Sequence, residues 1–113
     1  MELNAESNPS PSSNPAQNIA RNALTKAYTR ETEALIAEIR QKAGQIYDIN
    51  DIWSLHDYLS TKRYDIDGKY DDRDSGSVFV LAQLIQEGWL QPEDLSGLTP
   101  DTRAKIAALA RMK

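Results

Sequence analysis

Residues 17–43 read QNIARNALTKAYTRETEALIAEIRQKA, and this stretch decides the fold. It contains neither glycine nor proline, and alanine, glutamate, arginine, leucine and lysine dominate it. Because these residues have high intrinsic helix propensities, we predict one continuous α-helix from about Gln17 to Ala43. Apolar side chains recur within it at spacings of three, four and seven residues, which places them on one stripe of the helix. The members of that stripe are Leu24, Ala27, Tyr28, Leu35, Ile36, Ile39 and Ala43.

The predicted helix is long for so small a protein. At about 1.5 Å per residue it measures roughly 40 Å. A compact domain of 113 residues is only about 26 Å across. A helix that extends beyond its own domain needs a partner helix to cover its apolar stripe. We therefore expect self-association, with Leu35 and Ile39 in the interface, and a single bent helix is the alternative.

The composition is that of one globular domain with an acidic balance. The net charge is −4, so the chain lacks the positive field that favours nucleic acids. It has no cysteine, which excludes disulfides, thiol nucleophiles and thiolate metal sites. No apolar run reaches the length of a membrane span, and the N-terminus does not resemble a secretory signal. We expect a cytoplasmic protein without a cofactor.

The N-terminal segment differs in composition from the rest. Residues 1–16 are rich in asparagine, serine and proline and contain almost nothing apolar to bury. Such a composition predicts a disordered tail. The chain therefore divides into this tail and a single helical domain over residues 17–113.

Three further helices are predicted, which makes the fold all-α. The second helix spans about Asp51–Asp67, with Asp48 or Asn50 as its N-cap. Its expected buried residues are Ile52, Leu55, Leu59 and Ile66. A polar connection is expected over residues 65–76, where aspartates should cap the third helix and pair with Lys69 and Arg73.

The remaining elements are short. The third helix is expected over residues 75–87 and ends at Gly88. Its first apolar residues, 78–80, have strand propensity, but no second strand is available to pair with them. Residues 92–95 form a turn, and Thr99-Pro100 starts the last helix, which runs to about Met112. It buries Ile106 and Leu109 and exposes Arg103, Lys105 and Arg111.

The second helix carries the most unusual surface of the chain. At about 100° per residue, six side chains fall within one sector roughly 120° wide. They are Trp53, His56, Asp57, Ser60, Arg63 and Tyr64. Tryptophan and arginine dominate binding hot spots, because each offers a large contact area with directional polar groups. This sector is either a binding surface or the solvated side of an amphipathic helix.

Catalysis and metal binding find little support. His56 is the only histidine, and a zinc site around it would need carboxylates for its other ligands. Adjacent residues on a helix such as His56 and Asp57 are not expected to face each other. Aligning Gly68 with the invariant glycine of an EF-hand loop places Arg63 at the leading ligand position, which a cation cannot fill. No phosphate-binding loop is present, and the last helix is too weakly basic for a recognition helix.

Two long sequence runs resemble the fluorescence recovery protein family. The first is DIWSLHDYLSTKR at residues 51–63, and the second is YDIDGKYDDR at residues 64–73. The resemblance extends from about Ala23, through FVLAQL at residues 79–84, to KIAALAR at residues 105–111. The Trp-x-x-His-Asp and Ile-Asp-Gly-Lys-Tyr-Asp-Asp-Arg runs are unusual in composition, which makes them specific. The tail lies outside the resemblance.

The resemblance implies a helical homodimer in which the two long helices build the interface and the remainder forms a small head. It places Ile52 in that interface and groups Trp53, His56, Asp57 and Arg63 in a functional cluster beside it. It assigns Phe79 and Lys105, on the head, to contact with a protein partner.

The implied partner is the orange carotenoid protein in its activated red form, bound through its C-terminal domain. The regulator would speed the return to the orange form and release it from thylakoid-associated phycobilisomes, ending photoprotective quenching. It makes no covalent bond and is not expected to be an enzyme. The alternative is a dimeric helical adaptor that binds a different protein through the same surface.

Overall fold

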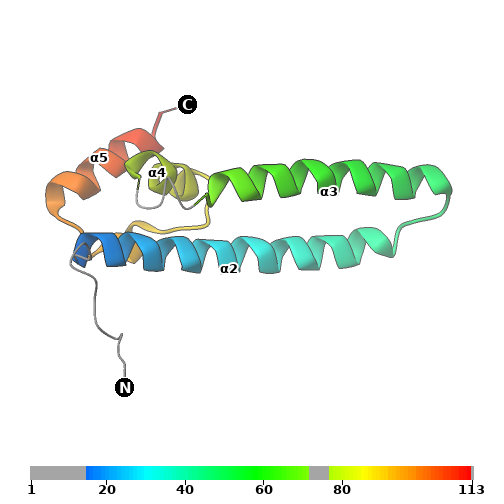
Figure 1. Ribbon diagram of the computed structural model, residues 1–113, viewed down its shortest axis with the longest axis horizontal. Coiled ribbons are helices and arrows are strands. Elements are labelled where there is room, and N and C mark those ends of the chain that lie inside the picture. The colour runs from blue at the N-terminus through cyan, green and yellow to red at the C-terminus, as the bar shows by residue number, and fades with distance from the viewer. Residues whose placement is uncertain (1–14, 72–76, 113) are drawn as a thin grey trace, which may run out of the picture.

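Two long antiparallel helices form a hairpin, and a small helical head lies at one end of it (Figure 1). The computed structural model describes residues 15–71 and 77–112. Helix α2 spans Pro15–Ala43 and helix α3 spans Ile49–Lys69. The head consists of α4 (Val78–Gln86), the 3₁₀ turn η2 (Pro92–Leu95) and α5 (Pro100–Ala110). The described residues contain helices and no strand, which confirms the all-α prediction.

Helix α2 begins two residues earlier than predicted, so residues 15 and 16 belong to the helix and not to the tail. Pro15 occupies its first position, where the missing N–H costs nothing and the fixed φ suits a helix. The other residues of the expected tail lie outside the described residues.

Helix α3 begins at Ile49 with Asp48 as its N-cap. The Asp48 carboxylate accepts a hydrogen bond from the backbone N–H of Asp51 at 3.1 Å, and the Asp51 carboxylate accepts one from the N–H of Asp48 at 3.3 Å. This reciprocal capping box satisfies N–H groups that have no partner within the helix. Of the two predicted caps, Asp48 is therefore correct and Asn50 is wrong.

The far end of α3 continues through Gly68 to Lys69, past its predicted end at Asp67. Part of the expected polar connection, residues 65–69, is therefore helical. The N-cap of α4 is Ser77, whose hydroxyl oxygen accepts a hydrogen bond from the N–H of Phe79 at 3.1 Å, and no aspartate takes this role. The expected helix start at Ser75 lies outside the described residues.

The later boundaries agree more closely with the sequence. Gly88 closes α4 with φ +91°, a backbone conformation that side chains with a Cβ rarely adopt. The predicted turn at residues 92–95 is confirmed as η2. Thr99 caps α5 and Pro100 is its first residue, as predicted, although α5 ends at Ala110 and not at Met112.

The core lies where the first half of α2 crosses the head. Alanines on α2 allow its backbone to approach the larger side chains of α4, η2 and α5 closely. Its buried members are Ala20, Ala23, Ala27, Leu81, Ala82, Leu84, Leu90, Leu95, Leu98 and Ile106. The buried position of Ile106 was predicted, and Leu109 is partly buried against this core.

Of the apolar stripe predicted for α2, only Ala27 belongs to its buried face. The fully buried residues of α2 are Ala20, Ala23, Ala27 and Glu31. Tyr28 is 47% exposed and Ile36 is 58% exposed. The head reaches only the first half of α2, where Leu24 packs partly against the core. Farther along the helix, Leu35 and Ile39 are only half-buried.

The buried residues predicted for α3 are confirmed for Ile66 and not for the other three. Only Ile66, next to the head, is buried. Leu55 and Leu59 are half-buried, and Ile52 is 42% exposed. The α2–α3 hairpin therefore lacks a closed core of its own beyond the head. None of the described helices is long and apolar enough to cross a membrane.

Polar contacts connect the two helices in that outer part. The Tyr58 hydroxyl donates a hydrogen bond to the Glu38 carboxylate at 2.7 Å. The Lys42 ammonium lies 3.9 Å from the same carboxylate and 4.8 Å from the centre of the Tyr58 ring. These long side chains bridge α2 and α3 without burying much apolar surface.

Candidate functional site

The six-residue sector predicted on α3 lies on the solvent side of the chain. Trp53 is 56% exposed, which is unusual for so large an apolar side chain. Tyr64 is also exposed, as are His56, Asp57, Ser60 and Arg63. Four of the six, His56, Ser60, Arg63 and Tyr64, line a shallow hollow together with Leu59 and Asp67.

The charged contacts within this sector are long and exposed to solvent. The Nδ1 atom of His56 lies 3.3 Å from the Oδ1 atom of Asp57, so the expectation that these neighbours do not face each other is wrong. Both side chains are more than 70% exposed, at 72% and 83%. Arg63 pairs with Asp67 at 3.6 Å, also in solvent. Because water screens such pairs, they cost little to exchange for contacts with another protein.

Apolar side chains accompany this polar sector along the hairpin. Ile36 on α2 and Ile52 on α3 are exposed, and Leu35 and Ile39 are half-buried. A surface that combines exposed isoleucine and tryptophan with solvated charges has the composition of a protein–protein interface. We call the set Leu35, Ile39, Ile52, Trp53, Asp57 and Arg63 the hairpin surface.

The two predicted partner-contact residues on the head lie apart from the hairpin surface. Phe79 projects from α4 and is 69% exposed, and Lys105 is exposed on α5. Trp53 is sixteen residues before the end of α3 at Lys69, about 24 Å along the helix. The structure therefore brings Trp53, His56, Asp57 and Arg63 together on one helix. Trp53 lies far from the head, whereas Arg63 is only six residues, about 9 Å, before the end of α3.

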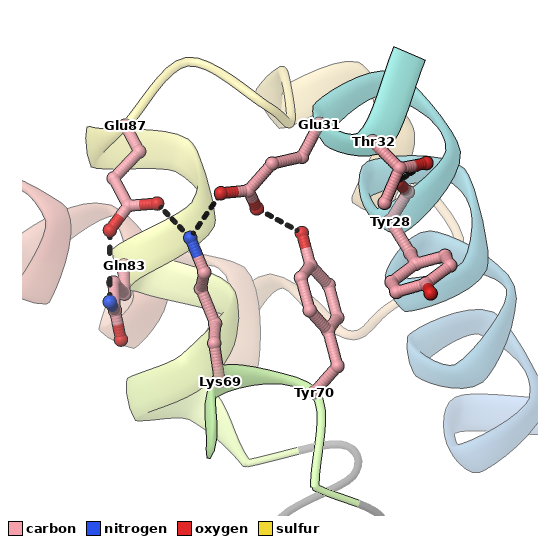
Figure 2. Close-up of polar contacts among 7 residues, drawn as sticks. All are labelled: Tyr28, Glu31, Thr32, Lys69, Tyr70, Gln83 and Glu87. Atoms are coloured by element: carbon pink, nitrogen blue, oxygen red, sulfur yellow. Dashed lines mark hydrogen bonds and ion pairs between the residues drawn. The ribbon is translucent and has the colours of Figure 1, made fainter. Parts of the chain in front are cut away.

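A buried ionic cluster at the junction of hairpin and head was not predicted (Figure 2). The Lys69 ammonium contacts the Glu31 carboxylate at 2.9 Å and the Glu87 carboxylate at 2.6 Å. The Tyr70 hydroxyl donates a hydrogen bond to Glu31 at 2.8 Å. These four residues come from α2, the end of α3, the residue after it, and the C-cap of α4, so they join both hairpin helices to the head.

The electrostatics of the cluster follow from its geometry. Burial alone would lower the pKa of Lys69, but its hydrogen bonds to Glu87 and Glu31 outweigh that effect and raise it. Burial would raise the pKa of Glu87, yet the hydrogen bond from Lys69 lowers it. Burial and the hydrogen bond to Glu31 raise the pKa of Tyr70, which stays protonated as a donor. Lys69 is therefore held as a cation.

A sequence signal for this cluster exists. The buried face of α2 follows spacings of three and four through Ala20, Ala23 and Ala27, and the next position is Glu31. A carboxylate on a buried face requires a cation, because burying an unpaired charge is very costly. Lys69 was expected to pair with aspartates of its own segment, and its contacts with Glu31 and Glu87 correct that expectation.

A second clamp holds the head against α2. An Nη1 atom of Arg30 donates to Asp94 at 2.9 Å and to the carbonyl oxygen of Trp89 at 2.9 Å. The backbone N–H of Gln91 also donates to Asp94. Together these bonds, with the Arg30 contact the larger contribution, lower the pKa of Asp94 to about 2. The clamp and the buried cluster fix the orientation of the head.

None of these groups has the geometry of a catalytic site. His56 and Asp57, the one histidine–carboxylate pair among the described residues, are solvated, and no nucleophile is bonded to them there. No three histidine, aspartate or glutamate side chains within residues 15–71 and 77–112 could hold a metal ion together. The arrangement is suited to binding other proteins.

Comparison with known proteins gives one consistent result. The family model of the photoprotection regulator fluorescence recovery protein matches residues 12–110. The fluorescence recovery protein of Synechocystis sp. is 54% identical over 87 residues, which covers 77% of this chain and 80% of the relative. The structure of the Synechocystis sp. PCC 6803 fluorescence recovery protein has a TM-score of 0.81 and 49% identity, covering 90% of this chain and 100% of that chain. The Fremyella diplosiphon fluorescence recovery protein gives 0.82 and 50%, over 88% and 98% of the two chains.

Proposed function

This chain belongs to the fluorescence recovery protein family of photoprotection regulators, and we propose that it binds the red form of the orange carotenoid protein and accelerates its return to the orange form. It is a regulator and not an enzyme. Return to the orange form releases the partner from the phycobilisome and ends quenching. The site of action is the cytoplasm at thylakoid-associated phycobilisomes.

The observation that carries this proposal is the family match over residues 12–110, which includes both exposed surfaces described above. A protein that contacts both separated domains of the red form would raise their effective concentration for each other. Each 1.4 kcal/mol removed from the reassociation barrier speeds recovery about tenfold. Preference for the red form requires tighter binding to it than to the orange form.

Two copies of the chain associate through the hairpin surface in this proposal. The support is the absence of a closed core in the outer hairpin, where Ile52 and Trp53 are 42% and 56% exposed. A second hairpin would cover them together with Leu35 and Ile39, and Asp57 and Arg63 would lie at the edge of the interface. The head remains outside the interface and accessible.

The head supplies the main contact with the C-terminal domain of the partner. Phe79 is a large exposed aromatic residue and Lys105 an exposed cation, which are the elements of a small recognition patch. Trp53, His56, Asp57 and Arg63 are expected to contribute to partner binding where the dimer leaves them accessible.

The decisive experiment follows the dark decay of the red form by absorbance, with and without this chain. We expect marked acceleration at substoichiometric amounts. Phe79→Ala should abolish most of it, whereas Tyr47→Ala, which removes an 88% exposed aromatic residue from the α2–α3 connection, should not. Unchanged decay with wild-type protein would reject the proposal and favour an adaptor for a different partner.

The dimer is tested separately by light scattering after size exclusion. Ile52→Asp should yield monomers, because a carboxylate would be buried unpaired in the interface. Thr61→Asp is the matched control, since Thr61 is exposed and lies about 180° around α3 from Ile52. Dimers of unchanged stability in the Ile52 variant would place the interface elsewhere.

A further inference from the structure

An apolar groove runs across the head between α5 and the C-terminal end of α4. Its volume is about 670 Å³. Aliphatic, alanine and proline side chains make up most of its lining: Ile85, Pro92, Leu95, Pro100, Ala104 and Ile106, with Ala107 and Ala110 along α5. Leu95 and Ile106 are also buried members of the core, so the bottom of the groove is rigid.

Two arginines stand along the same groove. Arg103 and Arg111 both line it and both are exposed. Arg103 lies on α5 and Arg111 is the C-cap residue of that helix, eight residues later, which is about 12 Å along the helix axis. Neither forms an ion pair within residues 15–71 and 77–112, in contrast to Arg30 and Lys69. The groove therefore combines an apolar floor with two available cations in a chain of net charge −4.

We propose that this groove binds an acidic amphipathic helix of the protein partner. A cleft between two helices accepts the apolar face of a third helix through side chains at positions i, i+3 or i+4, and i+7. Carboxylates about two turns apart on that helix would reach Arg103 and Arg111, and arginine pairs with carboxylates through two parallel hydrogen bonds. The inference rests on the proposed function, because it specifies how that partner is recognised.

The charge pattern selects this occupant over others. A basic or purely apolar segment would leave both guanidinium groups without partners at the border of a desolvated groove, which is unfavourable. The hairpin surface lies on the other part of the molecule, so a head groove engaged by the partner is compatible with association of two chains there. Lys105 and Phe79 do not line this groove, so the groove would be a contact with the partner separate from theirs.

The test is fluorescence anisotropy, which measures binding of the full-length chain to the red form of purified orange carotenoid protein. Ala107→Leu fills the groove, and Ala108→Leu is its control, because Ala108 is an exposed neighbour on α5 that does not line the groove. Arg103→Glu and Arg111→Glu reverse the groove charges, and Arg21→Glu makes the same change at an exposed site on α2. We expect each groove variant to weaken binding roughly tenfold and the arginine variants to reduce its salt dependence.

The outcomes separate this inference from the proposed function. Wild-type binding with unaffected groove variants would overturn the groove while leaving the function intact. Loss only in Ala107→Leu would overturn the acidic character of the partner segment. Absence of any wild-type binding would overturn both proposals. Circular dichroism of every variant confirms that the helices persist.

A photo-crosslinking residue in place of Ala107 identifies the occupant. The expected crosslink falls on a partner segment with apolar residues in helical spacing and acidic residues about two turns apart. Crosslinks to a second copy of this chain, or to its own residues 1–14, would overturn the proposal.

Discussion

Replacing Lys69 by methionine should destabilise this protein far more than the same change at an exposed lysine. Lys69 lies between two carboxylates, 2.9 Å from Glu31 and 2.6 Å from Glu87. Its side chain is 8% exposed and that of Glu31 is 6% exposed. Methionine keeps much of the volume of lysine but removes the charge, so two carboxylates would face each other without a cation.

The expected cost follows from what the change leaves behind. Removing one member of a buried ion pair typically costs about 3–5 kcal/mol, because the other charge stays buried and unpaired. Two features favour the lower end of that range. Glu87 is 35% exposed, so water can solvate it, and Glu31 still accepts the hydrogen bond from Tyr70 at 2.8 Å. We expect the free energy of unfolding to fall by about 3 kcal/mol.

Equilibrium unfolding in urea, at fixed protein concentration because association also contributes to stability, measures this change. The control is Lys42→Met, which removes an ion pair of 3.9 Å between side chains about 40% exposed, at 42% and 39%. Such a pair contributes at most about 1 kcal/mol. Equal losses for the two variants would refute the view that the buried cluster anchors the head to the hairpin.

Three further changes test individual contacts. Because the pKa of Asp94 is lowered from 3.8 to about 2, its pairing with Arg30 stabilises the fold above pH 4, and this is lost as the pH falls toward 2. Urea unfolding between pH 2 and 7 should therefore show a smaller acid loss for Asp94→Asn than for wild type, and equal slopes would contradict the assignment. Asp48→Ala should lower the free energy of unfolding by about 1 kcal/mol through loss of the capping box. Urea unfolding compares it with Asn50→Ala, and equal losses in the two variants would contradict Asp48 as the N-cap. Gly88→Ala should cost about 1 kcal/mol because φ there is +91°, and thermal unfolding with no shift would contradict the strained conformation.

Helix existence was predictable because its causes are local. The glycine- and proline-free composition of residues 17–43 and the Thr99-Pro100 start act over a few residues of chain. Predicted helix boundaries were wrong where residues distant in sequence contact the helix end. Helix α3 extends through Gly68 because Lys69 is bound by side chains 38 and 18 residues away in sequence. No local rule contains those contacts.

The candidate site was predictable in part. Helical periodicity placed Trp53, His56 and Arg63 in one sector, and the structure has them exposed on α3. Periodicity did not indicate that Trp53 lies far along α3 from the head, which carries Phe79 and Lys105. Sequence patterns could not predict the groove beside Arg103 and Arg111 either, since it forms only when α4 and α5 pack together.

The sequence by itself determined four helices, several of their caps, and the family to which the chain belongs. The tertiary structure decided which side of each helix is buried. On α2 the alanine face at Ala20, Ala23 and Ala27 faces the head, while the bulkier Ile36 stays exposed. Backbone hydrogen bonds and propensity act within a helix, whereas burial depends on what packs against it. The alanine face is the buried one because small side chains permit close approach of the helices. Glu31 lies on the same face and is therefore buried, and Lys69, at the end of α3, neutralises it.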